Sequence, residues 1–302
     1  MTSETTSPPP AAFRAAGDLR LLNWPALDAS GVDAAVTAHS GGVSSGPYES
    51  LNLSLSVGDD PGCVLENRRR LATAFGAAPG DFVFAHQVHG AGVRVVTASD
   101  RGRGAFSHDD AIGSASEAGS AGGASGAGPA DGADVLVTTS PGVVLAILTA
   151  DCVPIVLHDP VAGVLACVHA GWRGTVAGVT AAALAAMQGL GARPSDVIAG
   201  IGPAIGADRY QVGPDVHEAV SRSFGPATPG FIRPDPSAPG RWLLDLPSAN
   251  RHALREAGVP GPRIHTTDLV TGPVPGQFFS DRTARPCGRL ALVARLRPVG
   301  AR

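Results

Sequence analysis

The segment from residue 134 to residue 174 constrains the fold most, because it alternates short apolar runs with turn residues. A Pro-Gly pair separates two of these runs and a Gly-Trp-Arg-Gly turn ends the last, so the segment predicts consecutive β-strands. Residues 175–192 then carry Ala, Val, Leu and Met at helical spacing, with Thr175 as N-cap and Gly189 or Gly191 as the stop. Strand–turn–strand and strand–helix units predict an α+β fold rather than a regular doubly wound sheet.

Further segments add elements of both kinds. Residues 61–75 place Val64, Leu71 and Phe75 on one face, which predicts a helix. The run from Leu51 to Val57 alternates apolar and polar side chains, which predicts a strand. The remaining expected elements are a strand–bend–strand unit at 82–96, a strand, Gly-rich loop and helix at 196–220, a strand and helix at 241–259, and a closing strand at 289–297.

Two segments of biased composition bear on domain organisation. Residues 1–17 are rich in Ser, Thr and Pro and are expected to form a disordered tail. Residues 101–132 are a Gly/Ala/Ser-rich insertion without a periodic apolar face, expected to be flexible. Because sheet is predicted on both sides of the insertion, we favour one domain, 18–302, of mixed β-sheets flanked by helices. The alternative, a linker between two domains, would leave the N-terminal part a thin core.

Composition and charge exclude several function classes. The formal net charge is −3 and lysine is absent, which argues against a nucleic-acid surface. No run approaches the ~18 apolar residues needed to span a membrane, and the N-terminus lacks the pattern of a secretory signal. The protein is therefore expected to be cytoplasmic and to bind neither nucleic acid nor membranes. The cysteines are too scattered for a disulfide framework; they are Cys63, Cys152, Cys167 and Cys287.

Polar side chains with metal-binding or catalytic chemistry end several of the apolar runs. They are His86 and His89 in HQVH, Asp151 and Cys152 in ADC, and His169 in VHAGWRG. Strand ends can converge on one pocket. Two His and one Cys suit zinc with a fourth position open, whereas a Cys beside a His could also be a thiolate nucleophile and its base. A buried apolar cysteine and hydrogen-bonded histidines are the simpler alternative.

The turn at residues 171–174 offers a second kind of chemistry. Its glycines permit close approach of the backbone to a ligand, and Arg173 can form a bidentate contact with phosphate or carboxylate. The alternative is an ordinary strand-to-helix connection with a solvated arginine. The Gly-rich segment 200–206 lacks both the GxGxxG spacing and the lysine of a phosphate-binding loop, so it predicts no nucleotide site.

Together, HQVHG, TADCVPIVLHDP, VHAGWRGT, GIGPAIGADRYQVGPDV and FFSDR with CGRLA resemble the laccase-domain family. This family is also called YfiH-type or multicopper polyphenol oxidase, and its members have been reassigned as purine nucleoside phosphorylases. The motifs occur in the family's order and cover nearly the whole chain after the N-terminal tail. The resemblance implies a zinc ion held by His89, Cys152 and His169.

The implied reaction is phosphorolysis of adenosine, inosine, guanosine and 5′-methylthioadenosine, with adenosine deamination as a further activity. The expected partners are therefore a purine nucleoside and phosphate, and no protein partner is predicted. Arg173 could bind the phosphate, and Asp151 could relay a proton or orient a ligand. Asn52 and Arg282 match other polar positions of the family and are expected to help hold the nucleoside or phosphate.

The C-terminal motif departs from the family pattern. His265 stands where the family has Cys, and Asp281-Arg282 replaces Tyr-Arg, so contacts from this segment are not simply carried over. Three other functions stay open. They are a copper-dependent polyphenol oxidase, disfavoured because only Met1 and Met187 could supply a thioether ligand; a cysteine hydrolase using Cys152 with His169 or His89; and a non-enzymatic protein with a structural zinc.

Overall fold

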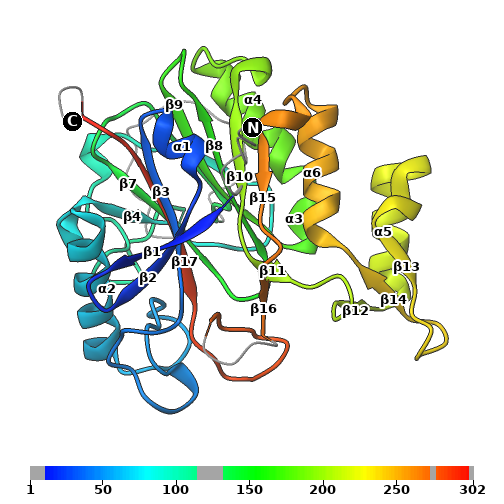
Figure 1. Ribbon diagram of the computed structural model, residues 1–302, viewed down its shortest axis with the longest axis horizontal. Helices are drawn as coiled ribbons and strands as arrows, with labels where there is room; N and C mark the ends of the chain where they lie inside the picture. Colours follow the sequence, from blue (N-terminus) through cyan, green and yellow to red (C-terminus); the bar gives the residue numbers. More distant parts are fainter. Residues whose placement is uncertain (1–10, 114–131, 273–276, 299–302) are drawn as a thin grey trace, which may run out of the picture.

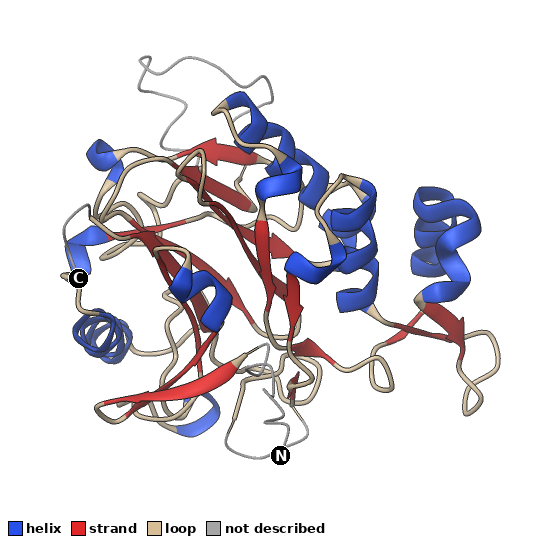
Figure 2. Cartoon of the chain, turned by 45° about the horizontal axis from the view of Figure 1, so that its top comes forward, coloured by secondary structure: helices blue, strands red, loops and turns tan. Residues whose placement is uncertain are grey.

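The computed structural model describes residues 11–113, 132–272 and 277–298. Within these ranges, two six-stranded sheets lie against each other and helices cover their outer faces (Figure 1, Figure 2). The expected α+β architecture, one domain of mixed sheets flanked by helices, is confirmed. None of the helices in these ranges has the length and apolar character needed to cross a membrane.

The first sheet has the strand order β1-β2-β3-β17-β7-β4. All its neighbouring pairs are antiparallel except β4 and β7, which run parallel. The closing strand predicted at 289–297 is β17, and it lies in the middle of this sheet. The strands are β1 Ala12–Ala16, β2 Leu19–Asn23, β3 Val32–Thr37, β17 Leu290–Leu296, β7 Val144–Thr149 and β4 Phe82–Phe84.

The second sheet has the order β15-β10-β8-β9-β6-β5. Its strands are β15 Ile264–Thr266, β10 Ile198–Ile201, β8 Val153–Asp159, β9 Val164–Ala170, β6 Val135–Thr138 and β5 Val93–Val95. Smaller sheets pair β11 Ala204–Ile205 with β16 Val270–Thr271, and β12 Gln211–Val212 and β13 Ile232–Pro234 with β14 Trp242–Leu244.

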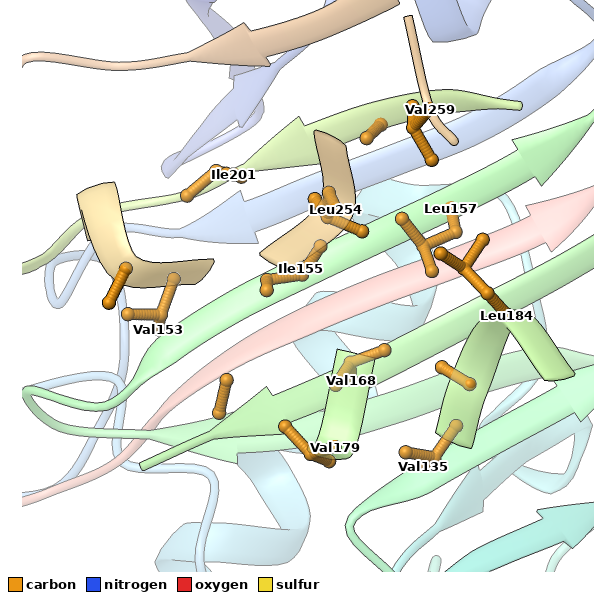
Figure 3. Packing of buried hydrophobic residues seen from close by; sticks show 14 of the residues in the cluster. Val135, Val153, Ile155, Leu157, Val168, Val179, Leu184, Ile201, Leu254 and Val259 are labelled. Atoms are coloured by element: carbon orange, nitrogen blue, oxygen red, sulfur yellow. The ribbon is translucent and has the colours of Figure 1, made fainter. Parts of the chain in front are cut away.

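The helices divide between the two outer faces. Helix α2 covers the first sheet, whereas α4 and α6 pack on the second around a core that includes Ile155, Val168, Leu184 and Leu254 (Figure 3). Helix α5 lies farther out, where it packs against α3 (Figure 1). A third apolar cluster fills the space between the sheets. The helices are α1 Pro25–Ala29, α2 Pro61–Phe75, α3 Trp172–Val176, α4 Val179–Gly189, α5 Pro214–Phe224 and α6 Leu246–Glu256. Short 3-10 turns occupy Gly46–Tyr48, Pro79–Asp81, Ala98–Asp100, Pro194–Asp196, Gly225–Gly230 and Gly261–Arg263.

The predicted hairpin is present and its register positions the site. Strands β8 and β9 pair antiparallel with Pro154 opposite His169. Alternation along β9 puts His169 on the same face as Leu165 and Cys167, which pack in the layer between the two sheets. The residues just before β8 and at the end of β9 therefore meet at one edge of that layer.

Helix α2 is confirmed at Pro61–Phe75, but the strand predicted from Leu51 to Val57 is wrong. The alternation is real, because Leu51 and Leu53 are fully buried. However, the Asn52 side chain accepts from the Ser54 amide and donates to the Ser54 carbonyl. These local bonds compete with a strand ladder and keep the segment irregular.

The helix predicted from residue 175 is interrupted. Helix α3 ends at Val176 and α4 begins at Val179, with Gly178 between them at φ +79°. Thr175 is therefore not an N-cap, since it lies inside α3. The predicted stop at Gly189 is confirmed as the last residue of α4.

The predicted tail and insertion are both shorter than expected. Residues 12–16 form β1 on the edge of the first sheet, which corrects the tail boundary at residue 17. Residues 101–113 are folded against β4, where Phe84 donates to Arg103 and Ile112 donates to Phe84. Residues 1–10 and 114–131 lie outside the described residues. The insertion is closed at its base by the Gly132 amide, which donates to the Gly113 carbonyl at 2.9 Å.

Candidate metal centre

The three predicted ligands come together at the edge of the layer between the sheets. One donor atom from each of His89, Cys152 and His169 lies within 4.8 Å of the other two. His169 ends β9, Cys152 precedes β8, and His89 belongs to the loop after β4. His169 is buried, Cys152 is half-buried and His89 is exposed, so the cluster opens to solvent on one side.

The loop that carries His89 is anchored by its neighbour Gln87. The Gln87 side chain donates to the Leu148 carbonyl and accepts from the Leu148 amide, both at 2.7 Å. It therefore pairs with the end of β7 as a neighbouring strand would. This holds the loop between the two sheets, where His89 meets His169.

Gly171 is required by the close approach of two ligands. A Cβ atom at this position would lie 2.9 Å from Cδ2 of His89 and 3.0 Å from Sγ of Cys152. Gly171 has an ordinary extended conformation, with φ −75°, so space and not backbone freedom makes glycine necessary here. The glycine of HAGWRG is thus part of the wall of the cluster.

The donor set fits a zinc ion. Tetrahedral zinc with its usual bond lengths needs ligand atoms roughly 3.3–3.8 Å apart. The donor atoms of the cluster all lie within 4.8 Å of one another, so small side-chain movements would bring them to that spacing. Burial opposes ionisation of the Cys152 thiol, but the adjacent His169 and His89 outweigh it and lower its pKa to about 6. A cysteine that ionises easily is a ready metal ligand.

Asp134 is a functional residue that sequence analysis missed. Its carboxylate lies 2.7 Å from Nδ1 of His169 and also accepts from the backbone amides of His89 and Gly90. Burial raises the pKa of Asp134, but these partners outweigh it and the pKa is lowered. Nothing local distinguishes Asp134 from the ordinary start of a strand. Its partners lie on β9 and in the 88–90 loop.

A pocket of about 470 Å³ opens from the cluster, a size that suits a small-molecule ligand. The walls combine the candidate metal ligands with aromatic and cationic side chains. The lining includes Gln87, His89, Asp151, Cys152, His169, Trp172, Arg173, Tyr210, Asp281, Arg282, Arg285 and Arg289.

The arginines of the pocket differ in whether a carboxylate neutralises them. Arg285 and Arg289 both form ion pairs with Asp281. Arg282 stacks over Tyr210 at 5.0 Å and donates to a backbone carbonyl, and Arg173 stacks over Trp172 at 4.5 Å. Within the described residues, neither Arg173 nor Arg282 has a carboxylate partner. Arg68, also in the pocket wall, is buried and donates to backbone carbonyls, so Arg173 and Arg282 are the two arginines of the pocket available to meet an anion.

The comparisons with known proteins agree with this geometry. Residues 33–297 match the family described as multi-copper polyphenol oxidoreductase laccase. The chain belongs to this family. It is 39% identical to the purine nucleoside phosphorylase YlmD of Geobacillus stearothermophilus, covering 85% of this chain and 86% of that protein. It is 43% identical to a purine nucleoside phosphorylase of Deinococcus radiodurans, covering 80% of each.

Solved structures of the family share the fold. The crystal structure of YlmD from Geobacillus stearothermophilus superposes with a TM-score of 0.85 at 36% identity, covering 96% of this chain and all of that one. The hypothetical protein YfiH of Bacillus licheniformis gives a TM-score of 0.84 at 31% identity, covering 94% and 99%. The resemblance stated from the motifs is therefore confirmed.

Two of the predicted polar residues of the family pattern have their side chains occupied within the protein. Asp151, at φ +93°, accepts from the Thr271 hydroxyl at 2.5 Å and from the Arg282 amide at 2.7 Å. Asn52 is fully buried and accepts from the Arg289 amide at 2.9 Å. Both side chains hold the arginine-bearing segment against the pocket. Asn52 lies behind the pocket wall, where a ligand does not reach it.

The structure changes the interpretation of two further residues, His86 and Tyr210. His86 was a candidate beside His89, but it is not part of the cluster, and its ring lies 5.1 Å from that of His108. Tyr210 was not singled out, although its ring lines the pocket beneath Arg282. Burial raises the pKa of the Tyr210 phenol, so it remains a neutral hydrogen-bond donor at physiological pH.

Proposed function

We propose that this protein is a zinc-dependent purine nucleoside phosphorylase. The observation that carries the proposal is one pocket that joins a His–Cys–His cluster to two uncompensated arginines. Relatives that share most of its length carry the name purine nucleoside phosphorylase. Adenosine, inosine, guanosine and 5′-methylthioadenosine are the proposed substrates, with phosphate as co-substrate.

The residues divide into two roles. His89, Cys152 and His169 would hold the metal, which would supply Lewis-acid activation when bound. Arg173 and Arg282 would bind phosphate, because a dianion is matched by two cations without their own counter-charge. Tyr210 lies under Arg282 and could donate its hydroxyl to the ribose or the phosphate.

Phosphorolysis needs phosphate oriented toward the glycosidic carbon. Trp172 and Tyr210 limit where the two guanidinium groups can move, since each arginine stacks on one of these rings. Asp151 fixes the backbone of Arg282 and in this way sets the position of that cation. The proposed role of Asp151 is therefore orientation of the arginine segment rather than proton transfer.

Adenosine deamination is proposed as a side activity, because it needs only the metal end of the pocket. A copper-dependent oxidase is less well supported. A thioether ligand is typical of blue-copper sites. Met187, however, lies on the buried face of α4 in the hydrophobic core, and Met1 lies outside the described residues. A cysteine hydrolase using Cys152 with His169 would share the same cluster and would be insensitive to zinc chelation.

The test is incubation of metal-analysed protein with adenosine, with and without phosphate, followed by chromatography of the products. Phosphate-dependent release of adenine and ribose 1-phosphate is expected, and Cys152→Ala should abolish it. Cys167→Ala is the matched control, because Cys167 is a buried apolar cysteine of β9 outside the cluster. Inosine formed without phosphate would indicate a deaminase alone. Absence of turnover by zinc-loaded protein would refute the proposal.

A further inference from the structure

We infer that Asp134 is the residue that positions the metal centre, by fixing two of its three ligands with one carboxylate. The inference rests on the proposed metal-binding function. Asp134 precedes β6, whose partner β9 carries His169. It is a positioning residue, because it reaches the metal only through the ligands that it holds.

The first contact sets the His169 ring. Oδ1 of Asp134 lies 2.7 Å from Nδ1 of His169, and the His169 amide also donates to the Asp134 carbonyl at 2.8 Å. An ionised carboxylate can only accept hydrogen bonds. Nδ1 therefore carries a proton, and Nε2 is the nitrogen that can give its lone pair to a metal ion.

The second set of contacts shapes the backbone at His89. Oδ1 accepts from the His89 amide at 3.0 Å, and Oδ2 accepts from the Gly90 amide at 2.6 Å and less directly from Val88 at 3.4 Å. His89 has φ +61°, a left-handed conformation that costs a non-glycine residue about 1 kcal/mol. The carboxylate offsets this cost by accepting successive amides of the same turn.

The side chain of Asp134 is fully buried, so each of its bonds matters. An asparagine has one acceptor oxygen and cannot serve both sets of donors. If its oxygen takes the place of Oδ2 and faces Gly90, its amide group donates to Nδ1 of His169, which moves the ring proton to Nε2, and the His89 amide loses its acceptor. If its oxygen faces His169 instead, the Gly90 amide loses its acceptor.

Asp159 supplies a matched control. It is 1% exposed and accepts from the backbone amides of Val161, Ala162 and Arg193 at 2.8–3.0 Å. It lies at the opposite end of β8 from Cys152 and contacts none of the three ligands. Asp159→Asn thus removes a comparable buried carboxylate without touching the centre.

The experiment measures the zinc dissociation constant of each full-length protein by competition with a chromophoric chelator. For Asp134→Asn we expect a rise of roughly 10- to 100-fold, and for Asp159→Asn a rise of less than about threefold. Cobalt-substituted protein gives a second readout, since the thiolate-to-metal absorption of Cys152 should shift or weaken only in Asp134→Asn. Thermal unfolding of both variants separates fold loss from ligand loss.

Equal zinc affinity of wild type and Asp134→Asn would overturn the inference, as would an equal loss in both variants. If Asp134→Asn does not fold, Asp134→Glu replaces it. The Asp134→Glu substitution keeps the negative charge but displaces the carboxylate. A weakened zinc affinity in this variant supports the inference, and an unchanged affinity overturns it. Wild type that binds zinc without phosphorolysis would refute the proposed reaction and leave this inference intact. Wild type that binds no zinc through these ligands would overturn both.

Discussion

The imidazole rings of His89 and His169 meet edge to face, with their centroids 4.8 Å apart. One ring comes from the loop after β4 in the first sheet and the other from β9 in the second. The centre thus joins the two sheets at the edge of their shared core. Its geometry depends on residues that let both rings approach Cys152.

Gly171→Ala is expected to weaken zinc binding by about tenfold or more, because the added methyl group would meet both His89 and Cys152. Chelator competition measures the effect. Gly189→Ala is the control, since this exposed glycine at the end of α4 has no atom within 4 Å of an added Cβ. Unchanged zinc affinity in Gly171→Ala would contradict the packing argument.

Replacing either uncompensated arginine, as in Arg173→Ala or Arg282→Ala, should raise the KM for phosphate by roughly 10- to 100-fold. A hydrogen bond to a charged group contributes about 1.5–3 kcal/mol. Arg285→Ala should change it by less than about threefold, because that side chain is 76% exposed and already paired with Asp281. Initial-rate kinetics with phosphate varied at saturating nucleoside provide the measurement. A larger effect at Arg285 than at Arg173 or Arg282 would reverse the assignment.

Asn52→Ala should destabilise the fold by about 2–3 kcal/mol and leave zinc affinity unchanged. Its side chain joins the Ser54 backbone, Asp59 and the Arg289 amide, and these groups would lose buried partners. Urea unfolding measures the loss. Asn23→Ala is a milder control, because Asn23 makes one side-chain bond, to Ala34. A stable Asn52→Ala with an altered KM would instead indicate direct substrate contact.

Acid should destabilise the protein partly through His158. Burial lowers the pKa of this histidine to about 4, against a raising effect of Asp159. The unfolded chain then binds more protons than the folded one between pH 6.5 and 4, so stability falls as pH falls through this window.

Between pH 7 and 4.5, His158 should therefore account for about 2–3 kcal/mol of the lost unfolding free energy. His158→Gln keeps a partner for the Ser30 hydroxyl but cannot titrate. Urea unfolding of wild type and variant at both pH values isolates the difference, since other groups contribute equally to both. Parallel losses in the two proteins would exclude His158 as the cause.

Much of the fold could be predicted because the signals were local. Helix α2 has an Asp60 cap, a proline in its first turn and Gly76 at its C-cap, and the β8–β9 hairpin has apolar runs with a turn between them. The segment Leu51–Val57 failed because side-chain bonds from Asn52 replaced the strand partners that alternation implies.

The site was predictable only in part. The motif resemblance pointed to the three candidate ligands, which the structure brings together, whereas the residues alone gave competing interpretations. The ion pairs of Asp281 with Arg285 and Arg289, four and eight residues along the same loop, were missed because the loop has no regular period that places side chains. Asp134 was missed because its partners come from distant segments. Such pairings depend on which strands become neighbours, and no local pattern encodes that.

The closed base of the insertion has a practical consequence. The Gly132 amide meets the Gly113 carbonyl, and His86 bonds to Ile112 on one side and to Ala133 on the other. These bonds hold residues 112–113 and 132–133 beside the backbone of His86, which lies three residues before the candidate ligand His89. A segment of a different length can therefore join residues 113 and 132 without moving His89. For the same reason, a fluorescent reporter inserted between residues 113 and 132 should leave the zinc affinity of the protein unchanged.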